Sequence, residues 1–104
     1  MKTNDLDLMC GLPGEPLVRQ GLADLRSGKQ TVPACLVGIA RSRLGKAGLL
    51  DRSTPSVAEP ELQLYRLLRR EGGDAYSRYN SLLRELISFE QALDRRTSRM
   101  ANEN

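Results

Sequence analysis

The sequence of 104 residues predicts a single-domain, all-α protein, and two observations lead to that prediction. One is the composition: with one Phe, three Tyr and no Trp, the core must be built mainly from Leu, Val, Ile and Ala, which favours helices over strands. The other is a C-terminal repeat whose apolar spacing alternates three and four, as in a helix packed along its length: Tyr79, Leu82, Leu86, Phe89, Leu93 and Met100. We expect a four-helix bundle with helices at about 15–27, 32–44, 60–71 and 74–100.

The N-terminal region contains the first two predicted segments. Residues 1–12 are expected to form a loosely ordered arm, of which Leu6, Leu8 and Met9 can dock on the body, and residues 13–104 a single helical domain. Prolines beside Gly14 mark a helix start, because the first helical amides have no partner in the helix. Gly28 fits the position just past the helix end, where a left-handed backbone suits glycine.

The second predicted helix is the most apolar segment. Thr31 is a plausible N-cap, and Pro33 lies in the first turn that follows. The run VPACLVGIA is short enough to be a buried strand instead. We prefer a helix over 32–44, because Ala, Cys and Leu dilute the β-branched residues and Leu44 continues the pattern.

The last two predicted helices form an antiparallel hairpin. Gly72-Gly73 ends the third helix, and Asp74 caps the fourth after a very short break. Counting outward from the glycines brings three aromatic side chains together: Tyr65, Tyr76 and Tyr79. We interpret them as a packed cluster in the core, with a tyrosine-lined ligand pocket as the alternative.

The fourth helix is about twice as long as the third, so part of its apolar face needs another partner. That part is either covered by the first two helices or forms an interface with a second protomer. The candidate interface residues are Leu86, Phe89, Glu90, Leu93 and Met100. Glu90 falls within the apolar face, where a carboxylate needs an arginine partner, exposure to solvent, or a role as a polar specificity contact between protomers.

The net charge of +3 arises in one segment, since the charges elsewhere balance. Within residues 31–58, Asp51 is outnumbered by four basic residues: Arg41, Arg43, Lys46 and Arg52. These side chains either complement a helix C-terminus and solubilise an apolar helix, or bind an anionic partner. Nucleic acid is not favoured as that partner, because four cations offer few phosphate contacts and the aromatics fall at core positions.

Several classes of function are disfavoured by what the sequence lacks. Without histidine the chain has no common general base, and Cys10 and Cys35 have no metal-ligand spacing around them. Gly45-Lys46 is not part of a phosphate-binding loop, because Ala40 and Ala47 occupy positions where that motif needs Gly and Ser or Thr. No signal peptide or membrane-spanning run occurs, so we expect a cytoplasmic protein with no cofactor and no metal.

The leading hypothesis is therefore a small soluble, non-enzymatic helical protein that acts through protein–protein interaction, by self-association or as an adaptor or regulator. The alternative is a nucleic-acid-binding regulator that uses the basic patch at the end of the second helix. A third reading, an enzyme or small-ligand binder, would use the tyrosines and Glu90.

Overall fold

The computed structural model describes the backbone of residues 8–102 and the side chains of residues 8–99. Over these residues it contains helices and no strands, which confirms the predicted all-α class. Five helices occur in this range instead of the four expected: α2 (Glu15–Arg26), α3 (Val32–Ile39), α4 (Arg41–Lys46), α5 (Pro60–Glu71) and α6 (Ala75–Asn102).

The additional helix arises because the predicted helix 32–44 is divided at Ala40. This residue, with φ −90° and ψ 10°, both ends α3 and begins α4. The change of direction leaves Leu44 fully buried while Arg41 reaches the connector beyond α4. One uninterrupted helix over 32–44 is therefore the wrong prediction for this segment.

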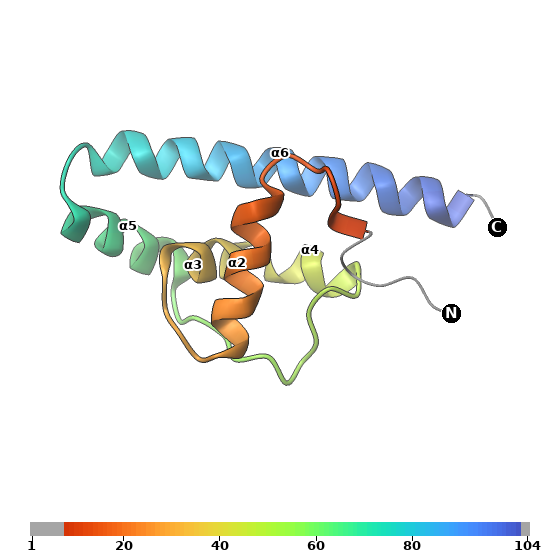
Figure 1. Cartoon of the computed structure of the whole chain (residues 1–104), viewed down its shortest axis with the longest axis horizontal. Coiled ribbons are helices and arrows are strands. Elements are labelled where there is room, and N and C mark those ends of the chain that lie inside the picture. Colours follow the sequence, from red (N-terminus) through yellow and green to blue (C-terminus); the bar gives the residue numbers. More distant parts are fainter. Residues whose placement is uncertain (1–7, 103–104) are drawn as a thin grey trace.

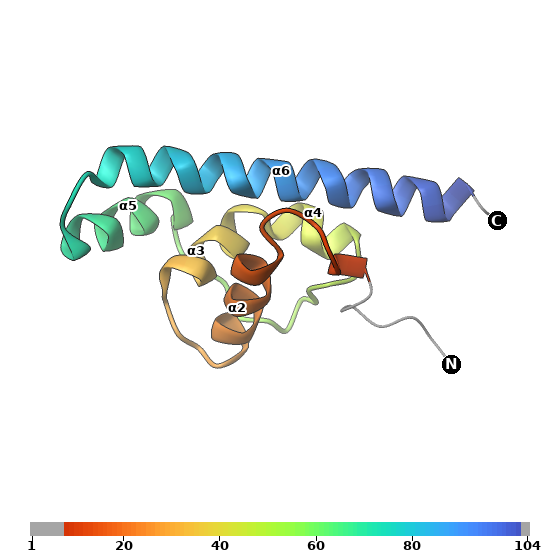
Figure 2. The same cartoon turned by 45° about the horizontal axis from the view of Figure 1, so that its top comes forward.

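Helix α6 runs the length of the molecule, and the other helices lie along one side of it (Figures 1 and 2). Its 28 residues correspond to about 42 Å at 1.5 Å per residue. α5 lies beside the first part of α6 and runs in the opposite direction (Figures 1 and 2). Asp74 caps α6 by accepting hydrogen bonds from the Ser77 amide (3.1 Å) and hydroxyl (2.8 Å).

Helices α2 and α3 make the closest helix crossing in the core, and Gly21 permits it. A Cβ atom placed on Gly21 would lie 2.3 Å from the Pro33 carbonyl oxygen and 2.4 Å from Val37 Cγ2. Gly21 therefore allows α3 to pack directly on the backbone of α2. Cys35, on the same short helix, is a free thiol and fully buried, as expected of a small apolar side chain.

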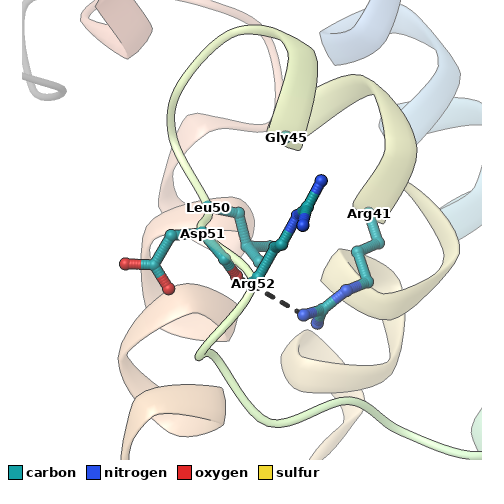
Figure 3. Close-up of a pocket in the computed structure, with 5 residues that line it drawn as sticks. All are labelled: Arg41, Gly45, Leu50, Asp51 and Arg52. Carbon is teal, nitrogen blue, oxygen red and sulfur yellow. Dashed lines mark hydrogen bonds between the residues drawn. The ribbon is translucent and has the colours of Figure 1, made fainter.

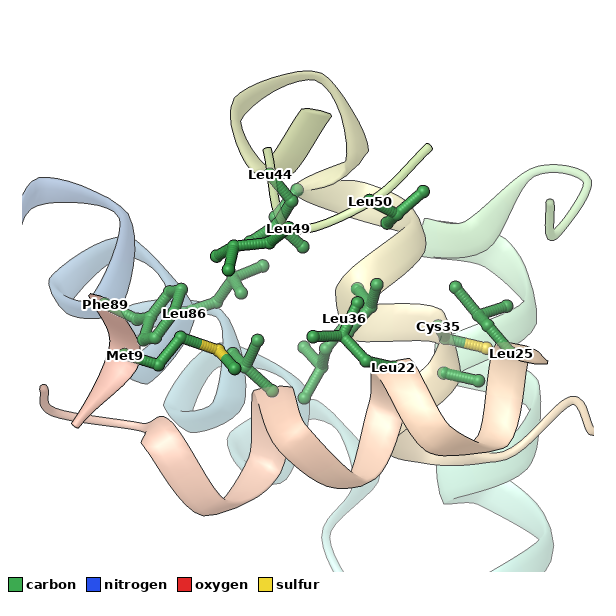
Figure 4. Packing of buried hydrophobic residues seen from close by; sticks show 14 of the residues in the cluster. Met9, Leu22, Leu25, Cys35, Leu36, Leu44, Leu49, Leu50, Leu86 and Phe89 are labelled. Carbon is green, nitrogen blue, oxygen red and sulfur yellow. The ribbon is translucent and has the colours of Figure 1, made fainter. Parts of the chain in front are cut away.

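Part of the predicted arm belongs to the core. Leu8, Met9 and Leu12 are buried, and Figure 4 shows Met9 gathered with Leu86 and Phe89 at one end of the hydrophobic cluster. Arg96 fixes this segment by donating hydrogen bonds to the carbonyl oxygens of Leu8 (3.0 Å) and Cys10 (2.8 Å). Residues 1–7 of the predicted arm lie outside the described residues.

A buried carboxylate joins the end of α2 to the start of α3. Asp24 accepts hydrogen bonds from the Thr31 hydroxyl (2.5 Å) and the Gln20 amide (2.9 Å). Thr31, the predicted N-cap, accepts in turn from the Ala34 amide (3.3 Å). The bonds from Thr31 and then Gln20 lower the pKa of Asp24 below its ordinary value.

Because α2 and α3 cross tightly at Gly21, a side chain added there should clash, whereas one added at Gly45, also within a helix, should not. Gly21→Ala should lower the free energy of unfolding by about 1–3 kcal/mol through overpacking. Gly45→Ala should leave it unchanged or raise it by up to about 1 kcal/mol, because the nearest heavy atom is 3.9 Å from the new Cβ. Urea denaturation of both variants measures the difference, and equal stabilities would contradict the crossing.

The Asp24 carboxylate predicts a pH-dependent contribution to stability. Because its pKa is lower in the folded chain, it stabilises the fold above the unfolded pKa of about 3.9, and the contribution is lost as pH falls through the folded pKa. Asp24→Asn should lower Tm by about 4–8 °C at pH 7. Thermal unfolding followed by circular dichroism should show that gap closing as pH falls below about 4. A gap independent of pH would contradict the role of the charge.

Candidate functional site

The four basic residues of the predicted patch do not form one surface, and Arg41 is used inside the fold. Its guanidinium donates hydrogen bonds to three carbonyl oxygens of the connector after α4: Thr54 (2.7 Å), Pro55 (3.1 Å) and Asp51 (3.5 Å). These bonds hold the 51–55 segment against the start of α4. Arg41 thus has a structural role that its position in the sequence did not indicate.

Arg43 faces α6, where two acids neutralise it. It donates a hydrogen bond to the Asp94 carboxylate, and its Nε lies 3.9 Å from Glu90 Oε2. Lys46 lines the same hollow between α4 and α6. Because Glu90 and Asp94 lie in this hollow, the Arg43 side of the predicted patch is not a surface of uniform positive charge.

Arg52 lies on the other side of α4, beside Arg41. The two side chains line an open cavity of about 510 Å³ together with Gly45, Leu50 and Asp51 (Figure 3). In this view the Asp51 carboxylate points away from both guanidiniums (Figure 3). The structure therefore brings together only Arg41 and Arg52 of the four predicted cations at this cavity.

Glu90 is partly buried, with 18% of its side chain exposed. Arg43 approaches it from α4, so the arginine partner that was one of the expectations for this carboxylate is present. Burial raises the pKa of Glu90, the Arg43 charge opposes that rise, and the neighbouring Asp94 adds to it. Keeping Glu90 ionised therefore lowers the free energy of unfolding.

The predicted interface on α6 needs a correction, because its apolar side chains face the protein's own core. Leu86, Phe89 and Leu93 are all buried, by the start of α2 and by residues 8–12 among others. They are not exposed for a second protomer to contact. The side chain of Met100 lies outside the part of the chain that the structure describes.

The predicted aromatic cluster is reduced to one pair. Tyr65 and Tyr79 make an edge-to-face contact with ring centroids 5.6 Å apart and planes at 85°. Tyr76 is 66% exposed, so the prediction that it lies in the core is wrong. It precedes Tyr79 by three residues but falls on the flank of α6 that α5 does not cover.

An exposed apolar surface on α5 and α6 was not predicted from the sequence. The exposed large apolar side chains among the described residues are Leu62, Tyr76 and Ile87, and all belong to these two helices. On α6, Tyr76 and Ile87 share a flank with half-buried Leu83, at spacings of seven and four. The signal that could have revealed this flank is a second apolar stripe, displaced by one residue from the core stripe.

The ion pair between Arg78 and Glu71 (2.8 Å) joins the start of α6 to the end of α5. At 3.6 residues per turn, the flank of Tyr76, Leu83 and Ile87 lies roughly 140–180° around α6 from Arg78. Leu62 lies about as far around α5 from Glu71. On its own helix each of the four points away from the ion pair, and together we call them the α5–α6 face: Leu62, Tyr76, Leu83 and Ile87.

Comparison with known proteins gives no relative: no family model, curated protein or solved structure matches this chain significantly. No helix among residues 8–102 combines the length and apolar character needed to cross a membrane. In the same range, no three His, Cys, Asp or Glu side chains are grouped as ligands for a metal ion. The geometry of the described residues gives two candidate sites: the α5–α6 face and the cavity beside Arg41 and Arg52.

The partly buried position of Glu90 predicts that removing its charge stabilises the fold. A raised pKa means that the folded state loses stability as pH rises through the unfolded pKa of about 4.3 toward the folded value. Glu90→Gln should therefore raise Tm at pH 7, by less than about 4 °C because the side chain is partly solvated. The gain should vanish below pH 4. A lower Tm at pH 7 would show that the Arg43 ion pair outweighs the cost of burial.

Proposed function

We propose that this chain is a non-enzymatic helical protein that binds another protein through the α5–α6 face. The observation that carries the proposal is the concentration of exposed apolar side chains there: Leu62, Tyr76 and Ile87 remain in water although the same helices bury their other faces. Exposed apolar side chains gathered on one pair of helices are typical of protein-binding sites. In this proposal α5 and α6 act as a helical hairpin that presents the face.

The spacing along α6 favours a helix as the bound element. Tyr76, Asn80, Leu83 and Ile87 follow one another at intervals of four, three and four, the repeat that packs side by side with a partner helix. Asn80 is the polar member of this row and is half-buried. A single asparagine in such a row helps to fix the register of a partner.

The charges around the face favour an acidic partner over a second copy. Arg66 and Arg69 on α5 lie on the side of Leu62, and Arg84 on α6 lies next to Ile87 around the helix. All three are exposed, and Glu59, which lines one hollow with Leu62 and Arg66, is the acid beside them. Two copies packed face to face would bring like charges together, whereas an amphipathic helix with an acidic rim would complement them.

We do not extend the proposal to nucleic acid. Of the four cations expected to contact phosphates, Arg43 already pairs with acids on α6, and Arg41 and Arg52 line a separate cavity on the other side of α4. The four therefore do not form the single basic surface that a nucleic-acid backbone needs.

A synthetic helix with Leu at its a and d positions and Glu on its remaining faces provides a direct probe of the α5–α6 face. Fluorescence anisotropy should give a micromolar Kd with the wild-type chain, weakening as salt is added. Ile87→Glu should weaken binding by at least about tenfold, because it places a charge in the apolar contact. Ser81→Glu adds the same charge at another exposed position of α6 and should change Kd by less than about twofold.

Two results would contradict this proposal. Equal Kd values for the Ile87→Glu and Ser81→Glu variants would mean that the α5–α6 face is not the binding surface. A stable dimer of the wild-type chain in light scattering, dissociated by Ile87→Glu, would mean that the face binds a second copy instead of an acidic partner.

A further inference from the structure

The cavity beside α4 has the properties of an anion site that is separate from the α5–α6 face. It holds two guanidiniums, from Arg41 and Arg52, on the walls of one open space of about 510 Å³ (Figure 3). We infer that it binds a phosphate group, as the free ion or on a small organic molecule. The inference depends on four features of the lining, and it stands whether or not the α5–α6 face binds protein.

Arg41 offers a guanidinium that is already fixed in place. Three of its five N–H donors are accounted for by the carbonyl oxygens of Asp51, Thr54 and Pro55, which leaves two for a ligand. A side chain held in this way loses little conformational entropy when an anion binds. Arg41 therefore acts as a preorganised donor on one wall of the cavity.

Arg52 supplies a second guanidinium with its donors available. It is exposed, and within residues 8–102 it makes no hydrogen bond or ion pair. Its guanidinium lies on the side of the cavity near Gly45 (Figure 3). Two guanidiniums on one cavity suit phosphate, whose oxygens accept from planar, forked donors.

The carboxylate of Asp51, the acid in the lining, is hydrogen-bonded to its own connector segment. Its Oδ1 accepts hydrogen bonds from the amides and hydroxyls of Ser53 (3.0 and 2.7 Å) and Thr54 (both 3.1 Å). These bonds lower the pKa of Asp51 and keep its carboxylate turned from the cavity (Figure 3). Neither arginine is therefore neutralised by the acid beside it.

Gly45 keeps the cavity open. A glycine within a helix destabilises it by about 1 kcal/mol relative to alanine, so its presence needs a reason. Gly21 and Gly38 lack a side chain because neighbouring helices or Pro60 approach them closely. No atom approaches Gly45 within 3.9 Å of a Cβ position, and its φ is not in the left-handed region. The missing side chain at Gly45 leaves space for a ligand.

The size of the cavity fits a small molecule. Sites for small ligands usually occupy about 300–1,000 Å³ and combine a few polar groups with apolar surface. Here the two arginines supply the polar groups, and Leu50 forms an apolar wall. The volume is enough for a phosphate ion together with a small organic group attached to it.

Titrations followed by ¹⁵N–¹H NMR at about 50 mM salt test this inference, with inorganic phosphate, ribose 5-phosphate and uncharged ribose as probes. Both phosphate probes should give saturating shifts within residues 41–55, and ribose should give none. Tighter binding of ribose 5-phosphate would identify an organic monophosphate as the preferred source, and equal binding would identify the free ion.

Two variants and a matched control make the assignment specific to the cavity. Arg52→Gln should weaken phosphate binding by at least about tenfold, since it removes a charged donor. Gly45→Leu should weaken it similarly by filling the space, although the charge is unchanged. Arg66→Gln removes an equally exposed arginine from α5 and should alter affinity by less than about twofold. The amide spectra of all three variants should show the native fold.

The inference is overturned if Arg52→Gln and Arg66→Gln bind phosphate equally well, or if the shifts spread over the arginines of α5 and α6. A 12-nucleotide single-stranded DNA should bind no more tightly than ribose 5-phosphate. Tighter DNA binding that Arg52→Gln abolishes would overturn the assignment to a small phosphorylated ligand and identify a nucleic-acid site.

Discussion

Helix α3 has no polar face to present to water, so the neighbouring helices must cover it on several sides. Its eight residues include four that are completely or almost completely buried: Ala34, Cys35, Leu36 and Val37. α2 approaches it through Gly21, and α5 begins beside Gly38, where Pro60 lies 3.2 Å from a Cβ position. A helix so short cannot stabilise itself and depends on tertiary burial. The two glycines therefore contribute to the fold by allowing close contact, which larger side chains would prevent.

Much of the fold could be predicted because the responsible signals are local. Thr31 and Asp74 cap helices through bonds to residues three positions away, and the repeat along α6 reports directly which side is buried. The division at Ala40 could not be predicted in the same way. The apolar pattern continues through Ala40 to Leu44, and the bonds from Arg41 to the connector, which lies ten or more residues ahead, leave no local signal in it.

The candidate sites were harder to predict, because charge and burial depend on contacts between distant segments. Arg43 and Asp94 are 51 residues apart, so nothing in the sequence around Arg43 indicates that it is neutralised. Because α6 is longer than α5, Leu86 and Phe89 were predicted to lie in an interface. In the structure Met9 and its neighbours cover both side chains (Figure 4). The face that is exposed instead, around Tyr76 and Ile87, is a second apolar stripe, and the longer core stripe beside it dominates the sequence pattern.

The hydrogen bonds from Arg96 to Leu8 and Cys10 have a consequence for the order of folding. They join residues 88 and 86 positions apart, among the most widely separated hydrogen bonds in residues 8–102. Contacts of this kind are expected to form late in folding, because they require the largest loop to be closed. During synthesis the segment at residues 8–12 cannot take its final place until residue 96 has emerged. Phe89 and Leu86, which residues 8–12 help to cover (Figure 4), therefore belong to the part of the core that is completed last.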